Sequence, residues 1–263
     1  MNLARAVAAE DGYRRMCALQ RMSAAELRGV LGGEPGVAAA WVEAAARLGV
    51  ADGQIRFGQM LLDGAAVACD PAAALRWFLK AAVAGAPAGM NMAGRCYENG
   101  WGAEIDFVEA ARWYLLAAEA GHDWGAYNWA NMRFDGRGVA QSHEDAVAWY
   151  RRAADQGHAR AMNLLARCCE EGWGTARDPA AAVGWYRGSA EAGYFRAQFN
   201  YGAVLAGVGQ VDEALDWFEQ ACRDAPPDSR NGMVARLAGH PEPRIAALGR
   251  RLASSHPIAV ASR

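Results

Sequence analysis

Residues 161–193 read AMNLLARCCEEGWGTARDPAAAVGWYRGSAEAG, and the pattern in this stretch recurs along most of the chain. The tryptophan of its Trp-Tyr pair is the last of five tryptophans, each 36 residues from the next: Trp41, Trp77, Trp113, Trp149 and Trp185. A glycine follows each of them eight residues later, at Gly49, Gly85, Gly121, Gly157 and Gly193. Fifteen residues beyond the first four glycines stand Gly64, Gly100, Gly136 and Gly172. Because a fixed period of about 20–50 residues marks stacked repeats, this chain of 263 residues is predicted to be a repeat protein.

Each unit is predicted to contain two helices, and the second, called helix B, is the more clearly bounded. Asp70 is an N-cap residue type, whose side chain accepts a hydrogen bond from an otherwise unpaired backbone N–H. Pro71 follows at the first helical position, where its missing N–H costs nothing. Gly85 ends the helix, since glycine adopts the left-handed conformation without a Cβ clash. The same cap position in later units holds Asp106, Ser142 and Asp178.

The first helix of each unit, called helix A, is illustrated by residues 159–171. Small and apolar residues recur there at helical spacing, namely Ala161, Met162, Leu165, Ala166 and Cys169. No alternation of apolar and polar residues predicts a strand. One helix pair does not bury its apolar face alone, so the pairs are expected to stack. The predicted fold class is all-α, a right-handed α-solenoid of stacked helix–turn–helix repeats.

The repeats are expected to form a single solenoid domain over residues 1–253. A degenerate unit at 12–50, with an incomplete helix A at about Gly12–Leu31, precedes five repeats over 51–225. In the last repeat Trp217 follows Trp185 by only 32 residues, which predicts a shortened loop at Gly207–Gln210. Two short helices, at about Arg230–Ala238 and Glu242–Ala253, are expected to cap the end over 226–253. Residues 254–263 are expected to form a flexible tail.

The bulk composition narrows the classes of function. A hydrophobic content of 53% with 21% charged residues suits a folded, soluble protein. The formal net charge of −2 and the pI near 6.2 argue against nucleic acid as the main ligand. Charges interrupt residues 1–16, so a secretory signal is not expected, and no run of about 18 apolar residues predicts a membrane span. The expected location is the cytoplasm.

Motifs that carry chemistry are missing from the sequence. The six cysteines show neither a C-x-x-C pair nor zinc-ligand spacing to a histidine: Cys17, Cys69, Cys96, Cys168, Cys169 and Cys222. They are expected to be free thiols packed as small apolar residues. The alternative is that the adjacent cysteines Cys168 and Cys169 form a redox pair. His122 and His158 share one repeat column, so repeat geometry explains them better than catalysis. HExxH, G-x-S-x-G and Walker motifs are absent. We expect no enzyme, no metal and no cofactor.

The repeat resembles the Sel-one-like repeat, a relative of the tetratricopeptide repeat, over about residues 37–225. The matching residues are Ala161-x-x-x-Leu165-Ala166, Gly172-x-Gly174, Asp178, Ala182-x-x-Trp185-Tyr186 and Ala190-x-x-Gly193. Gly136-Arg137-Gly138-Val139 reproduces the family's inter-helix loop most fully. Arg133 and Cys169 depart from the pattern, because they stand where the family has a large aromatic residue, as at Tyr97.

A solenoid offers partners an extended concave surface, which in tetratricopeptide-like folds is lined by helix A. Asn91 and Arg95 lie on one predicted helix A face outside the core stripe. With their counterparts they make the candidate binding set: Asn91, Arg95, Trp124, Tyr127, Asn131, Phe134, Arg160, Asn163 and Arg167. Asn suits a peptide backbone, Arg a carboxylate or phosphate, and an aromatic ring an apolar anchor. Two alternatives are that this face is simply solvated, or that its aromatic side chains are buried against a neighbouring helix.

The leading hypothesis is a protein–protein interaction scaffold or adaptor that binds a protein or peptide segment on the helix A surface. A weak β-lactam-type hydrolase is one alternative, implied by the resemblance to cysteine-rich family members, whose regular cysteine pairs are not reproduced here. A self-assembling structural array is another. Trp101 and Trp173, which stand between two loop glycines, predict either a second contact surface or side chains folded back onto the adjacent helix pair.

Overall fold

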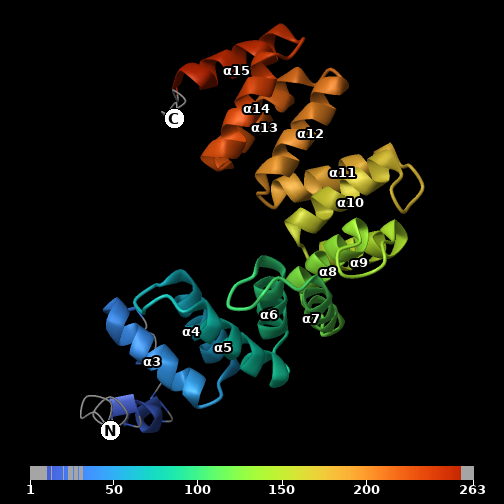
Figure 1. Cartoon of the computed structure of the whole chain (residues 1–263). Coiled ribbons are helices and arrows are strands. Elements are labelled where there is room, and N and C mark those ends of the chain that lie inside the picture. Colours follow the sequence, from blue (N-terminus) through green and yellow to red (C-terminus); the bar gives the residue numbers. More distant parts are fainter. Residues whose placement is uncertain are drawn as a thin grey trace. The chain divides into compact units, whose positions relative to one another are not determined.

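The computed structural model describes residues 11–255, apart from residues 13, 20, 23–25, 27, 28, 30 and 31. Its ordered elements are helices joined by short turns, with no strand among the described residues (Figure 1). The chain divides into two compact units, Met1–Gln141 and Ser142–Arg263.

The first unit alternates B and A helices, and each packs against the next along the chain. The B helices are α3 (Pro35–Arg47), α5 (Pro71–Val83) and α7 (Phe107–Glu119). The A helices are α4 (Ala51–Asp63), α6 (Pro87–Asn99) and α8 (Asp123–Asp135). Successive A helices also contact one another, α4 with α6 and α6 with α8. This contact between A helices stacks one repeat on the next.

The second unit continues the alternation and ends in two further helices. Its B helices are α9 (His143–Asp155), α11 (Pro179–Glu191) and α13 (Val211–Asp224). Its A helices are α10 (Ala159–Glu171) and α12 (Phe195–Gly207), which contact each other. The last two are α14 (Pro227–Ala238) and α15 (Pro243–Ser255), which pack on each other and contact α13.

The predicted helix boundaries are confirmed at both kinds of cap. Asp70 and Asp178 each accept a hydrogen bond from the backbone N–H three residues on, at 2.8 and 2.9 Å. The A helices α4, α6, α8 and α10 end at a left-handed C-cap glycine, such as Gly172 with a φ of 77°. The B helices α3, α5, α7, α9 and α11 end two residues before a glycine of positive φ, such as Gly85 at 86°, whereas α13 is followed by Ala225 and Pro226. The predicted class, an all-α solenoid of helix–turn–helix repeats, is confirmed.

The second glycine of the loops after α6, α8 and α10 is required by a close approach of two backbones, whereas the loop after α4 carries Ala66, also with a positive φ, at this position. A Cβ atom on Gly102 would lie 2.2 Å from the carbonyl oxygen of Pro71, and one on Gly174 would lie 2.2 Å from that of His143. Both glycines also have a positive φ, of 78° and 65°. Each loop therefore rests on the first turn of the preceding B helix, and only glycine fits there.

The shortened loop of the last repeat is confirmed, since only residues 208–210 separate α12 from α13. Helices α14 and α15 occupy the segment expected to form a cap, and α15 includes Ser254 and Ser255. The rest of the predicted tail, residues 256–263, lies outside the described residues. The predicted degenerate helix A at 12–31 falls partly on residues outside the described set. The single domain over 1–253 stays a prediction.

Candidate functional site

Two asparagines of the candidate set hold neighbouring A helices together. In the first unit the Asn128 side-chain amide of α8 donates to the Asn91 oxygen of α6 at 2.8 Å. In the second unit Asn200 of α12 donates to Asn163 of α10 at 2.9 Å. Asn91 and Asn163 are only 6% and 5% exposed. The expectation that they present their side chains to a partner is corrected, because their amide oxygens are used inside the helix packing.

Two arginines of the set lie over loop tryptophans. The Arg95 guanidinium carbon is 5.1 Å from the ring centre of Trp101, and that of Arg167 is 5.3 Å from the ring centre of Trp173. Neither arginine forms an ion pair with any residue that the structure describes. Trp101 is half-buried and packs against the core of the first unit, so it folds back onto the adjacent helices. Each ring therefore orders a cation that lacks a carboxylate partner in the described chain.

The intervening loop carries Arg137 where the others carry tryptophan, and this cation is used internally. Its Nη1 donates to Glu98 Oε1 at 2.8 Å. The other oxygen of Glu98 accepts a 2.6 Å bond from the buried Tyr114 hydroxyl. Burial, followed by the Glu98 carboxylate, raises the pKa of Tyr114. Glu98 is thus a structural carboxylate that ties α6 to α7 and to the loop after α8.

The aromatic members of the set lie on α8. The rings of Trp124 and Tyr127 meet edge to face, 6.0 Å apart, and Trp124 remains 42% exposed. Tyr127, Asn131 and Phe134 are half-buried. Trp124 is the large aromatic side chain that this helix leaves most open to solvent.

The second unit adds three more arginines that lie over aromatic rings. Arg160 of α10 lies over Tyr194 at 5.8 Å, and Arg196 of α12 lies over Phe195 at 5.7 Å. Arg236, from α14, lies 4.8 Å from the ring centre of Phe199. No sequence signal indicated Arg236 as a member of this surface, because α14 lies outside the repeat and has no column to compare.

The histidine column is a set of helix caps. Nδ1 of His122 accepts from the Gly125 backbone N–H at 3.0 Å, and Nδ1 of His158 accepts from that of Ala161 at 3.1 Å. An acceptor nitrogen carries no proton, so the capping form is the neutral imidazole. Burial lowers the pKa of His122, and the neighbouring Asp123 opposes this shift. The interpretation by repeat geometry is confirmed.

The six cysteines are free thiols, and Cys96, Cys168, Cys169 and Cys222 are buried as expected, but Cys69 is exposed and Cys17 is half-buried, so the expectation that all are packed as small apolar residues is wrong for these two. Burial raises the pKa of Cys96 to about 12 and that of Cys168 and Cys222 to about 11. Because the thiolate is the reactive form, these buried thiols are poor nucleophiles and poor redox centres. The described residues contain no group of three side chains suited to a metal ion and no helix long and apolar enough to cross a membrane.

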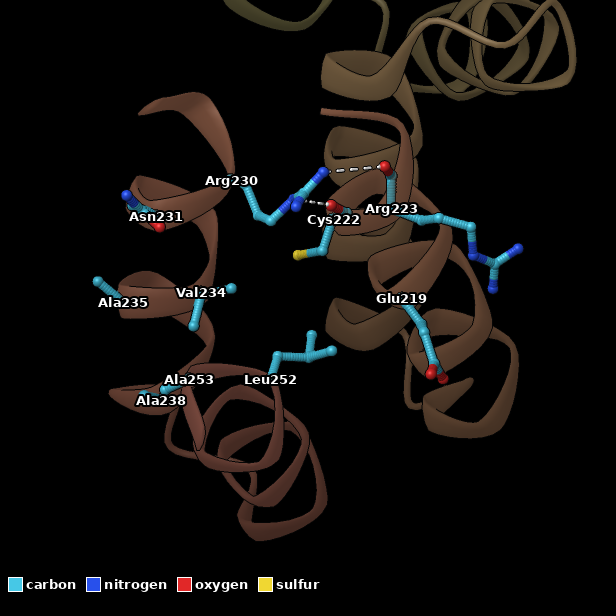
Figure 2. A pocket seen from close by; sticks show the side chains of 10 residues that line it. All are labelled: Glu219, Cys222, Arg223, Arg230, Asn231, Val234, Ala235, Ala238, Leu252 and Ala253. Carbon is cyan, nitrogen blue, oxygen red and sulfur yellow. Dashed lines mark hydrogen bonds between the residues drawn. The ribbon is translucent and has the colours of Figure 1, made fainter. Parts of the chain in front are cut away.

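A hollow of about 310 Å³ lies between α13, α14 and the end of α15 (Figure 2). Its lining is mainly apolar, with Val234, Leu252 and several alanines, and Cys222 projects into it. Arg230 reaches across to α13, where it donates to the carbonyl oxygens of Cys222 at 2.6 Å, Ala225 at 2.9 Å and Arg223 at 3.2 Å. The guanidinium therefore caps the end of α13, and the sequence did not predict this hollow.

These features define a helical repeat protein built from paired A and B helices, with ordered cations on the A helices. The Sel1 repeat model matches residues 42–85, 87–122, 125–158, 159–194 and 196–225. The chain belongs to the Sel1 repeat family. Proteins of this family generally serve as protein–protein interaction scaffolds.

Solved structures share the fold. A Sel1 repeat protein from Oxalobacter formigenes is 27% identical with a TM-score of 0.68, over 79% of this chain and 89% of that one. A protective antigen of uropathogenic Escherichia coli with an SLR fold is 27% identical with a TM-score of 0.66, over 84% of this chain but 49% of that one. The chain thus spans about half of that antigen. An immunity protein from Pseudomonas aeruginosa, 18% identical over 78% of each chain with a TM-score of 0.53, shares the fold alone. No curated protein matches this chain.

Proposed function

We propose that this protein is an interaction scaffold or adaptor whose A helices bind a segment of a partner protein. The observation that supports the proposal is that each unit has an A-helix arginine whose guanidinium lies over a loop tryptophan: Arg95 over Trp101 and Arg167 over Trp173. Stacking holds the guanidinium plane in place and leaves its edge N–H groups able to bind a carboxylate or a carbonyl in a bidentate manner. A side chain ordered before binding loses less entropy when a partner arrives.

The other members of the set have complementary roles in this proposal. Trp124 and Tyr127 provide an apolar anchor in the first unit, and Asn131 and Phe134 extend it along α8. Arg160 adds a further cation in the second unit. Asn91 and Asn163 do not contact the partner in this proposal; their hydrogen bonds to the next A helix fix the spacing of the helices that carry the binding residues. The proposed setting is the cytoplasm, where unpaired thiols stay reduced.

The test is affinity capture from the native host with purified protein as bait. Reversing the charge of both arginines, by Arg95→Glu with Arg167→Glu, should abolish capture of a partner while helicity and melting temperature stay unchanged. The matched control is Lys80→Glu with Arg152→Glu. These two cations also lie over tryptophans, Trp77 at 4.2 Å and Trp149 at 4.3 Å, but on the B helices of the same two units.

The control variant removes the same charge from each unit, so its capture should match the wild type. Undiminished capture by the Arg95→Glu, Arg167→Glu protein would show that the helix A surface is not the binding site. Equal loss in both variants would show that total charge, and not the surface, decides binding.

A further inference from the structure

Within the second unit, arginines gather on the A-helix side more densely than repetition alone requires. Arg160 and Arg196 occupy the second position of α10 and of α12, 36 residues apart. Arg167 follows Arg160 by seven residues, which is two helical turns and the same face. Arg236 comes from α14 and covers Phe199, which lies one turn after Arg196.

The register of these helices is settled by a direct bond. The Asn200–Asn163 hydrogen bond joins α12 to α10 between the levels of Arg160 and Arg167. Packed helices lie about 8–10 Å apart, and seven residues of a helix rise about 10 Å. The helix positions of Arg160 and Arg167 are therefore roughly 10 Å apart along α10, and that of Arg196 lies roughly 10 Å from Arg160 on the neighbouring helix α12.

Three of these guanidiniums form no ion pair among the residues that the structure describes, namely Arg167, Arg196 and Arg236. Each lies over an aromatic ring, at 5.3, 5.7 and 4.8 Å from its centre. In contrast, Arg187, Arg244 and Arg251 of the same unit pair with Glu191, Asp212 and Glu219. Arg152 on α9 also lies over a ring, that of Trp149, without an ion pair among the described residues, so the A-helix face is distinguished by the gathering of such cations from α10, α12 and α14.

The charge of the whole unit favours a protein over a nucleic acid as the occupant. Residues 142–263 contain 14 arginines and 14 aspartates and glutamates, so the formal charge is zero. A domain that binds a polyanion usually carries a basic excess, which attracts phosphates from a distance. Here the positive charge is local, and it complements a short row of carboxylates.

We infer that the second unit binds an extended acidic segment of a partner protein, with carboxylates that reach Arg167, Arg196, Arg236 and Arg160. The inference rests on the proposed function and specifies its partner. An extended segment in the polyproline II conformation has three residues per turn and rises about 3.1 Å per residue, so carboxylates three residues apart lie on one face and match a spacing of roughly 10 Å. Guanidinium groups bind carboxylates through two parallel N–H···O bonds, which lysine does not reproduce.

The test measures binding of a synthetic peptide to the full chain by fluorescence anisotropy. The probe is a fluorescein-labelled peptide of about 12 residues, roughly 40 Å when extended, with glutamate at every third position. The same peptide with glutamine in those positions and a single-stranded DNA oligonucleotide of similar length are the comparisons. We expect the glutamate peptide to bind best, and its affinity to fall as salt is raised.

Arg167→Glu with Arg196→Glu and Arg236→Glu should weaken binding at least tenfold, on the order of one lost charge-assisted contact. Lysine at the same three positions should restore only part of the affinity, because it keeps the charge and loses the planar fork. The matched control reverses three exposed arginines on B helices of the same unit, Arg151, Arg152 and Arg187, and should bind as the wild type does. Circular dichroism checks that every variant is folded.

Equal binding of the glutamate and glutamine peptides would overturn the acidic segment, and so would undiminished binding by the triple glutamate variant. Tighter binding of the oligonucleotide would overturn it in favour of nucleic acid. Self-association that the same variant abolishes, seen by light scattering, would overturn it in favour of a second copy of this chain. If partner capture still depends on Arg95 and Arg167 while the glutamate peptide fails to bind, the scaffold function stands and only the acidic partner is wrong.

Discussion

Helices α6 and α10 carry the same functional side chains 72 residues apart, yet they hold their glutamates differently. In α6, Glu98 accepts from the Tyr114 hydroxyl at 2.6 Å and also pairs with Arg137 at 2.8 Å. In α10, Glu170 accepts from the Tyr186 hydroxyl at 2.7 Å, with no arginine counterpart among the described residues. The glutamate at this repeat position is therefore held by a tyrosine and an arginine in the first unit, and by a tyrosine alone in the second.

The difference follows from one residue in the loop after the next A helix. Arg137 stands in the loop after α8, and its 36-residue spacing continues through the loop after α10. The loop after α12 is shortened to residues 208–210, which leaves Gly209 where a second arginine of this kind would stand. Gly209 has no side chain that could reach Glu170, so this glutamate lacks the loop cation that Glu98 has in Arg137.

The largest effect is expected from the loop glycines, which test whether both units depend on the same contact. Gly102→Ala and Gly174→Ala each place a Cβ 2.2 Å from a backbone carbonyl oxygen at a positive φ. Each should cost about 3–5 kcal/mol in the free energy of unfolding, from strain and overpacking together. Urea denaturation measures the loss.

Gly85→Ala is the control for the glycines, because nothing lies within 4 Å of its added Cβ and only the positive φ remains. It should cost about 1–2 kcal/mol. If Gly174→Ala is tolerated as well as this control, the loops of the two units do not pack alike.

Removal of the two glutamates tests whether Glu98 stabilises the fold through two partners and Glu170 through one. Glu98→Ala leaves the buried Tyr114 hydroxyl and the Arg137 guanidinium without their partner, and should cost about 2–4 kcal/mol. Glu170→Ala leaves only the Tyr186 hydroxyl and should cost about 1–3 kcal/mol. Thermal and chemical denaturation give both values, and a larger loss for Glu170→Ala would contradict the comparison.

The helix cap at His122 should make the first unit sensitive to acid. Its folded pKa is lowered by burial, below an unfolded value of about 6.5, so the unfolded chain binds the proton more readily. The stabilisation is therefore present above about pH 6.5 and is lost as the pH falls through the lower folded value.

His122→Asn keeps a cap acceptor and removes the titration. The difference in unfolding free energy between about pH 7.5 and 5 should shrink by about 1 kcal/mol, the ordinary value of an N-cap. Denaturation at a series of pH values measures it, and an unchanged slope in the variant would assign the acid sensitivity to other groups.

The smallest effect is expected in native thiol labelling. Cys69 in the first unit is exposed, whereas Cys168, Cys169 and Cys222 in the second are buried. Brief treatment with iodoacetamide near pH 7.5 should modify Cys69 and leave the three thiols of the second unit unmodified, because burial raises their pKa. Peptide mass spectrometry identifies the labelled sites, and rapid labelling of Cys222 would indicate that the α13–α15 hollow opens in solution.

Much of the fold was predictable because its signals are local. Caps such as Asp70 and Asp178, and the left-handed glycines that follow helices α3 to α11, act within a few residues and recur every 36. The shortened loop at 208–210 was predictable for the same reason. The candidate surface was predictable only in part, since helical spacing places Asn91 and Arg95 on one face without indicating which is covered.

Neighbouring repeats decided that difference. Asn91 and Asn163 are buried because Asn128 and Asn200 reach them from the next A helix, 37 residues on. Arg236 joins the surface because α14, outside any repeat, folds over Phe199. The amino-acid pattern determined the helices, their order and the family, because backbone capping and helical periodicity depend on residues close in sequence. Which polar side chains remain open to a partner was decided only by packing between repeats, because a hydrogen bond or a ring contact across 30 or more residues leaves no mark within either helix alone.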